Sequence, residues 1–242
     1  MRRLVPHPGE TTVERQLADY RPWEQATAGR PFVAMNFAAT LDGRAAIEGR
    51  SGQIGSATDT AMLGGLRARF DAVMIGAGTM RAERYGRISS SEARRHEREA
   101  LGLPADPLLV IVSGRLDLPW DAPLFSEGGR VLVFTAAEEE QPPPTEASVE
   151  VVRHQGQVDL TEALRQLHRE RGVQALLCEG GPRLHSELWS LDLVDELFLT
   201  LAPKLTGAGP SIVEGELPAP AELELAWLLE DRGELFGRYR RA

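Results

Sequence analysis

Short apolar runs alternate with helix-like segments along most of this chain, and that alternation constrains the fold more than any other feature. The runs at 31–38, 71–76, 107–114 and 130–135 are dominated by aliphatic and β-branched residues, as buried strands are. The segment 56–70 instead spaces its apolar residues three or four apart, as a helix does. Strands that alternate with helices predict an α/β fold with a mixed, mostly parallel central sheet flanked by helices.

Two of the helices can be placed by their N-terminal residues. Ser56 with Asp59, and Asp159 with Glu162, match the pattern of a side chain that caps a helix. The buried faces are predicted to contain Met62, Leu63, Leu66 and Phe70 in the first helix and Leu160, Leu164 and Leu167 in the second.

The two ends of the chain depart from the alternation. Residues 1–30 contain a short helix candidate, ERQLADY, among prolines and glycines, and we expect an N-terminal arm there. The tail, ELELAWLLEDRGELFGRYRR, predicts an antiparallel hairpin that turns near residues 231–233. A proline-rich connection lies at 136–147, but neither half has enough strands for a sheet of its own. We therefore expect one domain over residues 31–242.

Composition excludes several classes of protein. The net charge of −9, from 27 basic and 36 acidic residues, argues against an extended nucleic-acid surface. The only cysteine, Cys178, excludes an internal disulfide and a multi-cysteine metal site, and we expect it to be buried. The first residues lack the apolar stretch of a signal peptide, and no apolar run is long enough to span a membrane. A cytoplasmic protein without a membrane partner is expected.

Two glycine-containing stretches follow predicted strands. In IGAGT, Gly76 and Gly78 would let a ligand approach the backbone, but Arg81 stands where a dinucleotide fingerprint needs a third glycine. An ordinary turn over GAGTMRAE explains this stretch equally well. In EGGPRLHSE, two glycines precede Pro182, which suits a first helical turn. Free N–H groups at such a helix start can bind phosphate, although a simple strand-to-helix turn has the same pattern.

Several charged or polar side chains lie beside these stretches. Glu179 could accept hydrogen bonds from the N–H groups of a heterocycle, or it could belong to a buried ion pair. Arg67 flanks the apolar stripe of its helix, where it could bind a phosphate or extend into solvent. Ser113 and Arg115 follow a strand and would suit a second phosphate. His185 is expected on a helix surface.

Four stretches in order along the chain, RPFVAMNFAATLDGRAAI, LRARFDAVMIGAGTMRAE, LLVIVSGRLDLP and LLCEGGPRLHSELWSLDLVDELFLTLAPKLTGAG, resemble the pyrimidine reductase family of riboflavin biosynthesis. The resemblance extends over roughly residues 30–209 and is to stand-alone reductases, which have no zinc deaminase domain. It implies a dihydrofolate-reductase-like fold, a homodimer and no metal. It also implies that NADPH donates a hydride to a phosphorylated ribosylaminopyrimidine, such as 5-amino-6-(5-phosphoribosylamino)uracil, to give the ribitylamino product.

The resemblance also implies roles for individual residues. The substrate-binding residues would be Ser51, Arg67 and Glu179. The cofactor-binding residues would be Ala39, Thr79, Glu83, Ser113, Arg115, Gly180, Gly181, Pro182, Arg183 and Leu184. Glu83 is also the candidate for an orienting carboxylate in catalysis. Arg115, or failing that Arg81, would pair with the 2′-phosphate that distinguishes NADPH from NADH.

Two positions differ from the family pattern and keep other functions open. Gln53 lies where many members have a tryptophan, and after GAGT the order Glu83, Arg84, Tyr85 replaces the usual acidic pair and proline. A reductase of the same fold that acts on another heterocycle, such as dihydrofolate or a pterin, therefore remains an alternative. A non-catalytic nucleotide-binding module is the other alternative.

Overall fold

The computed structural model describes residues 1–89 and 91–242, which form two compact units. The first unit comprises Met1–Tyr20, Val33–Leu66 and Pro182–Ala242. The second comprises Arg21–Phe32 and Arg67–Gly181. The first 20 residues thus belong to the first unit, while the domain boundary at residue 30 stays a prediction.

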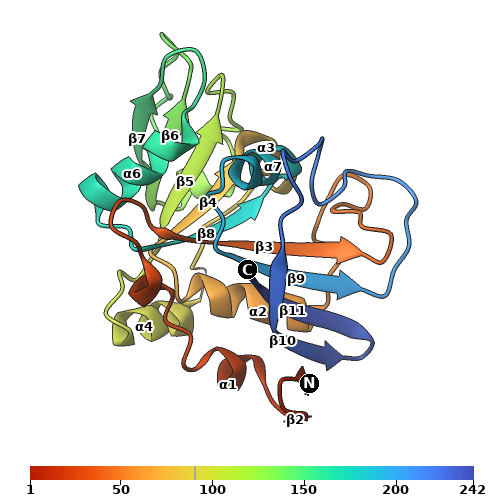
Figure 1. Ribbon diagram of the computed structural model, residues 1–242. Coiled ribbons are helices and arrows are strands. Elements are labelled where there is room, and N and C mark those ends of the chain that lie inside the picture. Colours follow the sequence, from red (N-terminus) through yellow and green to blue (C-terminus); the bar gives the residue numbers. More distant parts are fainter. Residues whose placement is uncertain (90) are drawn as a thin grey trace. The chain divides into compact units, whose positions relative to one another are not determined.

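The second unit is built on five parallel strands in the order β8-β4-β5-β6-β7 (Figure 1). Their bounds are Ala72–Gly76 for β4, Leu108–Ser113 for β5, Arg130–Thr135 for β6, Ser148–Arg153 for β7 and Ala175–Gly180 for β8. Strands β4, β5 and β8 are almost wholly buried, which accounts for their continuous apolar sequences. The predicted strands are confirmed, and Cys178 is fully buried in β8.

Among its described residues, the second unit has one short helix before these strands and four between them. They are η1 (Pro22–Gln25), α3 (Ala77–Glu83), α4 (Glu92–Ala100), α5 (Pro123–Ser126) and α6 (Leu160–Arg171). Asp159 caps α6 by accepting the N–H of Glu162 at 3.0 Å, and Gly172 ends it with a φ of 69°. Leu160, Leu164 and Leu167 are buried, so the predicted helix and its buried face are confirmed. The turn predicted over GAGTMRAE was wrong, because most of this segment forms α3.

The first unit has a mixed sheet in the order β2-β1-β10-β11-β9-β3 (Figure 1). The strands are β1 (Arg2–Val5), β2 (Gly9–Glu10), β3 (Phe32–Thr40), β9 (Glu196–Ala202), β10 (Leu223–Asp231) and β11 (Glu234–Arg241). Only β3 and β9 pair in parallel; the other pairs are antiparallel. Arg232 and Gly233 turn the C-terminal hairpin with positive φ angles, as the sequence predicts.

The first unit also contains α1 (Val13–Leu17), α7 (Pro182–Ser190) and most of α2 (Ala57–Arg67). Ser56 caps α2, because its hydroxyl accepts the N–H groups of Thr58 at 3.1 Å and Asp59 at 3.4 Å. Met62 and Leu66 are buried, as predicted, whereas Leu63 is half-buried. The chain thus has the expected mixed α/β fold, with a mostly parallel set of strands and a C-terminal antiparallel hairpin. None of its described helices is both long enough and apolar enough to cross a membrane.

Candidate functional site

Three neighbouring parallel strands of the second unit bring candidate residues to one edge. Gly180 at the end of β8 is paired with Ile75 of β4, and Gly76 at the end of β4 is paired with Val112 of β5. Ser113 follows immediately and is only 3% exposed. The carboxyl ends of parallel strands are where α/β sheets bind their ligands. This edge is therefore the candidate site.

A bidentate ion pair joins two of the predicted substrate-binding residues at this edge. Arg67 donates from Nε to Oε1 of Glu179 at 2.6 Å and from Nη2 to Oε2 at 2.5 Å. The side chain of Arg67 is 20% exposed and that of Glu179 only 3%. Burial disfavours the cation, but the charge and hydrogen bonds of Glu179 outweigh it and raise the pKa of Arg67. The ion pair that the sequence left open for Glu179 is present, and its role toward a substrate stays a prediction.

Tyr85 completes this group of side chains. Its hydroxyl donates to Oε2 of Glu179 at 3.1 Å, and the guanidinium carbon of Arg67 lies 5.5 Å from its ring centroid. Arg84 ends α3 in a left-handed conformation, with a φ of 48°, and the carbonyl of Tyr85 accepts the N–H of Leu124 at 2.9 Å. Burial and the negative charge of Glu179 raise the pKa of Tyr85, so the phenol is a neutral donor.

The two glycines after Glu179 face the first turn of α3. Gly180 has a φ of 127°, a conformation that side chains rarely adopt. A Cβ on Gly181 would lie 2.9 Å from the hydroxyl oxygen of Thr79. Gly76 is the N-cap of α3, and as a glycine it has no side chain to accept hydrogen bonds from the first turn. N–H groups of that turn are thus left for a ligand. This bare backbone beside a hydroxyl fits the phosphates of a dinucleotide cofactor.

The predicted cationic partners of such a cofactor lie nearby in the chain. Arg115 is exposed two residues after Ser113 and makes no ion pair with the residues that the structure describes. Arg81 on α3 instead donates to the carbonyl of Asp117 at 2.7 Å. Glu83, the last residue of α3, is half-buried. Arg115 is thus the freer of the two cations.

The remaining candidates belong to the first unit. Ala39 is fully buried in β3, and Ser51 lies in the exposed loop between β3 and α2. Pro182, Arg183 and Leu184 form the first turn of α7. The structure therefore groups Arg67, Thr79, Glu83, Ser113, Arg115, Glu179, Gly180 and Gly181 in the second unit and the other five in the first.

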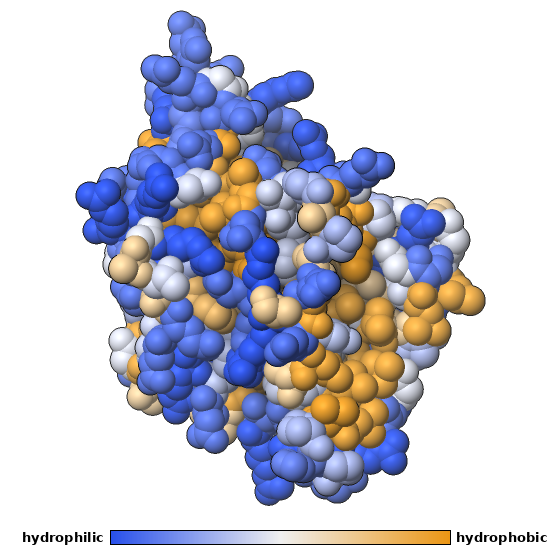
Figure 2. Space-filling model, in the orientation of Figure 1, coloured by the Kyte–Doolittle hydropathy of each residue, from blue (hydrophilic) through white to orange (hydrophobic). Residues whose placement is uncertain are grey.

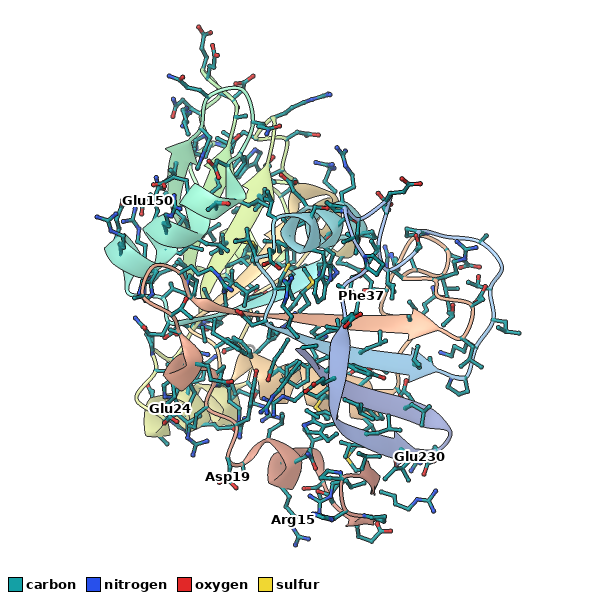
Figure 3. All side chains as sticks on the ribbon, in the orientation of Figure 1. Arg15, Asp19, Glu24, Phe37, Glu150 and Glu230 are labelled. Carbon is teal, nitrogen blue, oxygen red and sulfur yellow. The ribbon has the colours of Figure 1, made fainter. Side chains whose placement is uncertain are left out.

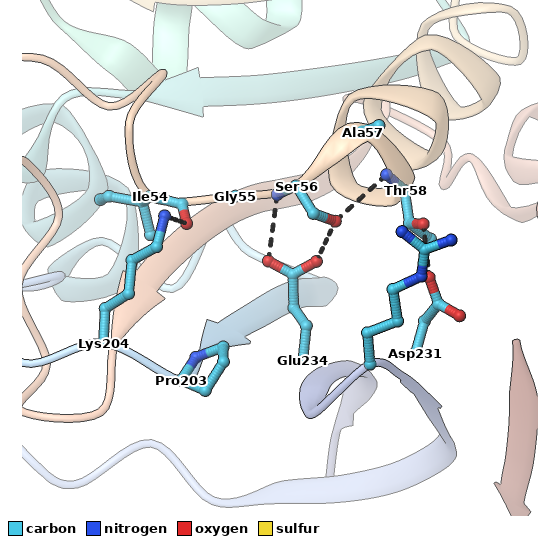
Figure 4. A pocket seen from close by; sticks show the side chains of 10 residues that line it. Ile54, Gly55, Ser56, Ala57, Thr58, Pro203, Lys204, Asp231 and Glu234 are labelled. Carbon is cyan, nitrogen blue, oxygen red and sulfur yellow. Dashed lines mark hydrogen bonds between the residues drawn. The ribbon is translucent and has the colours of Figure 1, made fainter.

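The end of the loop that carries Ser51 is fixed at the edge of a pocket of about 180 Å³ (Figure 4). The ammonium group of Lys204 donates to the carbonyls of Gln53 at 2.6 Å and Ile54 at 2.9 Å. On the other side, the carboxylate of Glu234 accepts the N–H of Ser56 at 3.2 Å and also its hydroxyl. An exposed ammonium group and a buried carboxylate therefore hold the backbone of this loop.

His185 differs from its prediction. It was expected on a helix surface but is only 1% exposed, so that prediction was wrong. Its ring packs edge-on against Phe37 of β3, which is labelled in Figure 3, with centroids 4.3 Å apart. The inward face of α7 carries His185 between Leu184 and Leu188, both of which are buried.

Parallel strands that end in a glycine pair, a hydroxyl and a buried carboxylate are compatible with a reductase that binds a nicotinamide cofactor. The chain belongs to the RibD C-terminal domain family, which matches residues 31–232. The family suggested by the sequence motifs is thereby confirmed.

Relatives with established names agree with this membership. The chain is 35% identical over 193 residues to the 2,5-diamino-6-ribosylamino-4(3H)-pyrimidinone 5′-phosphate reductase of Archaeoglobus fulgidus, covering 77% of this chain and 88% of that protein. It is 34% identical to the riboflavin biosynthesis protein RibD of Chlamydia trachomatis over 76% of this chain, but over only 48% of that protein.

Solved structures show the same fold. A pyrimidine reductase-like protein from Corynebacterium diphtheriae superposes with a TM-score of 0.78 at 26% identity, covering 96% of this chain and 99% of that one. A deaminase and 5-amino-6-(5-phosphoribosylamino)uracil reductase from Thermotoga maritima gives a TM-score of 0.71 at 27% identity, covering 88% of this chain and 57% of that one.

Proposed function

We propose that this protein uses NADPH to reduce a phosphorylated ribosylaminopyrimidine to the ribitylamino compound in riboflavin biosynthesis. The observation that carries the proposal is the ion pair between Arg67 and the buried Glu179. Glu179 immediately precedes the glycine pair at the carboxyl end of β8. A carboxylate for the heterocycle and a bare backbone for the cofactor are thus adjacent in the chain. The names of the relatives supply the reaction.

Glu179 and Arg67 would hold the substrate. The carboxylate would accept a ring N–H in a setting where only 3% of the side chain is exposed, so a mismatched ring would leave a buried charge poorly paired. Arg67 fixes the plane of that carboxylate through two parallel hydrogen bonds. Ser51 would add a hydroxyl from the exposed loop of the first unit.

The cofactor would lie along the glycine pair. Gly180, Gly181 and Thr79 would receive its phosphates, and Ala39, Ser113, Pro182, Arg183 and Leu184 would contact the rest of the molecule. Arg115 would pair with the 2′-phosphate and so favour NADPH over NADH. When bound, the cofactor supplies the hydride from its nicotinamide ring. Glu83 would orient the reactants through its carboxylate, and the protein contributes mainly by holding them in position.

We also propose a cytoplasmic homodimer. Several large apolar side chains of the first unit are exposed, among them Leu41, Leu205 and Leu225. Figure 2 shows hydrophobic surface gathered over the region of β10 and β11 in its lower right part. A second copy of the chain would cover such a surface. Sedimentation analysis at several protein concentrations tests the oligomeric state.

Steady-state oxidation of NADPH by the purified protein tests the reaction. The phosphorylated ribosylaminopyrimidine should be turned over, while dihydrofolate should not, and NADH should support a lower rate. Arg115→Ala should reduce the difference in rate between NADPH and NADH without changing the KM for the pyrimidine. Turnover of dihydrofolate in place of the pyrimidine would show that the substrate is wrong but the cofactor chemistry right.

A further inference from the structure

Tyr85 limits what the carboxylate of Glu179 can bind. Oε1 accepts one hydrogen bond, from Nε of Arg67 at 2.6 Å. Oε2 accepts two, from Nη2 of Arg67 at 2.5 Å and from the hydroxyl of Tyr85 at 3.1 Å. A carboxylate has about four acceptor positions, two on each oxygen. Among the residues that the structure describes, three of these positions are thus occupied, and the open one is on Oε1.

The position of Tyr85 is fixed by its own backbone and ring. The left-handed Arg84 turns the chain out of α3, and the hydrogen bond from Leu124 holds the carbonyl of Tyr85. The ring lies against the guanidinium of Arg67, which is itself bound to the carboxylate. The raised pKa of Tyr85 keeps the hydroxyl protonated at neutral pH, so it continues to donate to Oε2.

This hydrogen-bond pattern distinguishes the two ring types that the names of the relatives contain. A 2-amino-4(3H)-pyrimidinone presents two adjacent donors, its ring N3–H and its amino group, and a carboxylate binds such a pair best with both oxygens. A uracil presents a single N–H between two carbonyls at the same edge. One open position on Oε1 matches the uracil, whereas the second donor of the 2-amino ring would meet an oxygen that Arg67 and Tyr85 already saturate.

We infer that Tyr85 is a specificity-determining residue that acts through Glu179 and selects a uracil-type ring over a 2-aminopyrimidinone. This inference rests on the proposed function and names the substrate class within it. The hydroxyl of Tyr85 selects the ring type by donating to Oε2 of Glu179, and the aromatic ring of Tyr85 holds the guanidinium of Arg67.

The chain offers a matched control in the first unit. Tyr20 also donates to a buried carboxylate, Oε2 of Glu196, at 2.8 Å. Arg238 forms a bidentate pair with Glu196 and places its guanidinium carbon 4.5 Å from the ring of Tyr20. The same three kinds of side chain therefore occur in the first unit among residues that are not candidates for the site, and the loss of this hydroxyl should affect stability alone.

The test is the ratio of kcat/KM for the uracil and the 2-aminopyrimidinone substrates, both as ribosylamino 5′-phosphates, in three proteins. A hydrogen bond to a charged group changes affinity by roughly 10- to 100-fold, so the wild type should prefer the uracil by at least about tenfold. Tyr85→Phe should reduce that preference by about tenfold, mainly through a lower KM for the 2-amino substrate. Tyr20→Phe should melt at a lower temperature and keep the wild-type ratio.

Each other outcome has a definite meaning. A wild type that prefers the 2-amino ring, or a Tyr85→Phe ratio equal to that of the wild type, would overturn the inference and leave the proposed function intact. Should Tyr85→Phe be too unstable to purify, a wild type that prefers the 2-amino ring would still overturn the inference. Failure of the wild type to turn over either pyrimidine would reject the proposed function, and the inference with it.

Discussion

Arg98 allows the most specific prediction about stability. It lies on α4 with no exposed surface. Its Nε donates to the carbonyl of Pro104 at 2.8 Å, and its Nη1 donates to those of Arg67 and Phe70, each at 2.7 Å. Burial lowers the pKa of Arg98 to about 10, although the charges of Asp71 and Asp106 oppose this change. A buried cation thus joins α4 to the chain at the end of α2.

Arg98→Met keeps most of the volume and removes the hydrogen bonds. Each of the three carbonyls, of which only that of Phe70 takes part in a fully buried hydrogen bond, would lose a partner, at about 1 to 3 kcal/mol apiece. Removal of a poorly solvated cation stabilises the folded state by about 3 kcal/mol, the free energy that corresponds to the lowered pKa of Arg98. The net loss therefore lies between about 0 and 6 kcal/mol, and we expect a value near the midpoint of about 3 kcal/mol, a large share of the roughly 5 to 15 kcal/mol that stabilises a typical domain.

Equilibrium unfolding in urea measures this loss. Arg95→Met is the matched control, since Arg95 lies on the same helix, is half-buried and donates one hydrogen bond, to the carbonyl of Ser89 at 3.1 Å. The control should lose about 1 kcal/mol or less. If the two variants unfold at the same urea concentration, the three carbonyls do not depend on Arg98 and the reasoning is refuted.

Three further outcomes are expected. Lys204→Met should release the loop that carries Ser51 and raise the KM for the pyrimidine by about tenfold, because two hydrogen bonds from a cation are lost. Arg232 lines the same pocket, and Arg232→Met should leave this KM unchanged. Equal KM values in the two variants would contradict the role of Lys204. Burial raises the pKa of Asp59, although a hydrogen bond from Thr200 opposes this, so the folded state binds the proton more tightly than the unfolded state. The stability that Asp59 contributes through this proton is fully present below its usual pKa of 3.8 and is lost as the pH rises through the raised pKa. Asp59→Asn should therefore be more stable than the wild type at neutral pH and should lose that advantage on acidification. If the reasoning fails, urea unfolding will show the same difference in free energy of unfolding between the two proteins at every pH. Gly181→Ala places a Cβ 2.9 Å from the Thr79 hydroxyl and should weaken NADPH binding in a fluorescence titration, whereas Gly9→Ala, with open space around its Cβ, should bind as the wild type does.

Local patterns were enough to predict most elements of the fold. The strand β5 has a continuous apolar sequence, and α6 combines a cap at Asp159 with leucines spaced three and four apart. Each of these signals lies within a dozen residues. The strand β1 was missed because four residues carry no periodicity, and it is recognisable only through its pairing with β10.

The contacts of the site depend on the tertiary fold and were harder to predict. Arg67 and Glu179 were each identified as candidates, but they are 112 residues apart in the sequence and nothing local indicates that they pair. Tyr85 was noted only as a departure from a family pattern, since its hydrogen bond to Glu179 spans 94 residues. His185 was placed on the wrong face because a short helix with mixed residues does not indicate which side is buried.

The kcat/KM for NADPH-dependent reduction of the phosphorylated ribosylaminopyrimidine, compared between the wild type and Glu179→Gln, tests the central claim most directly. The wild type should turn the pyrimidine over, and kcat/KM should fall by roughly 10- to 100-fold or more in the variant with NADPH binding unchanged, because a buried charged acceptor is replaced by a neutral one. Circular dichroism and the melting temperature would establish that the variant is folded. Wild-type activity in a folded Glu179→Gln protein, or no reduction of the pyrimidine by the wild type, would contradict the account.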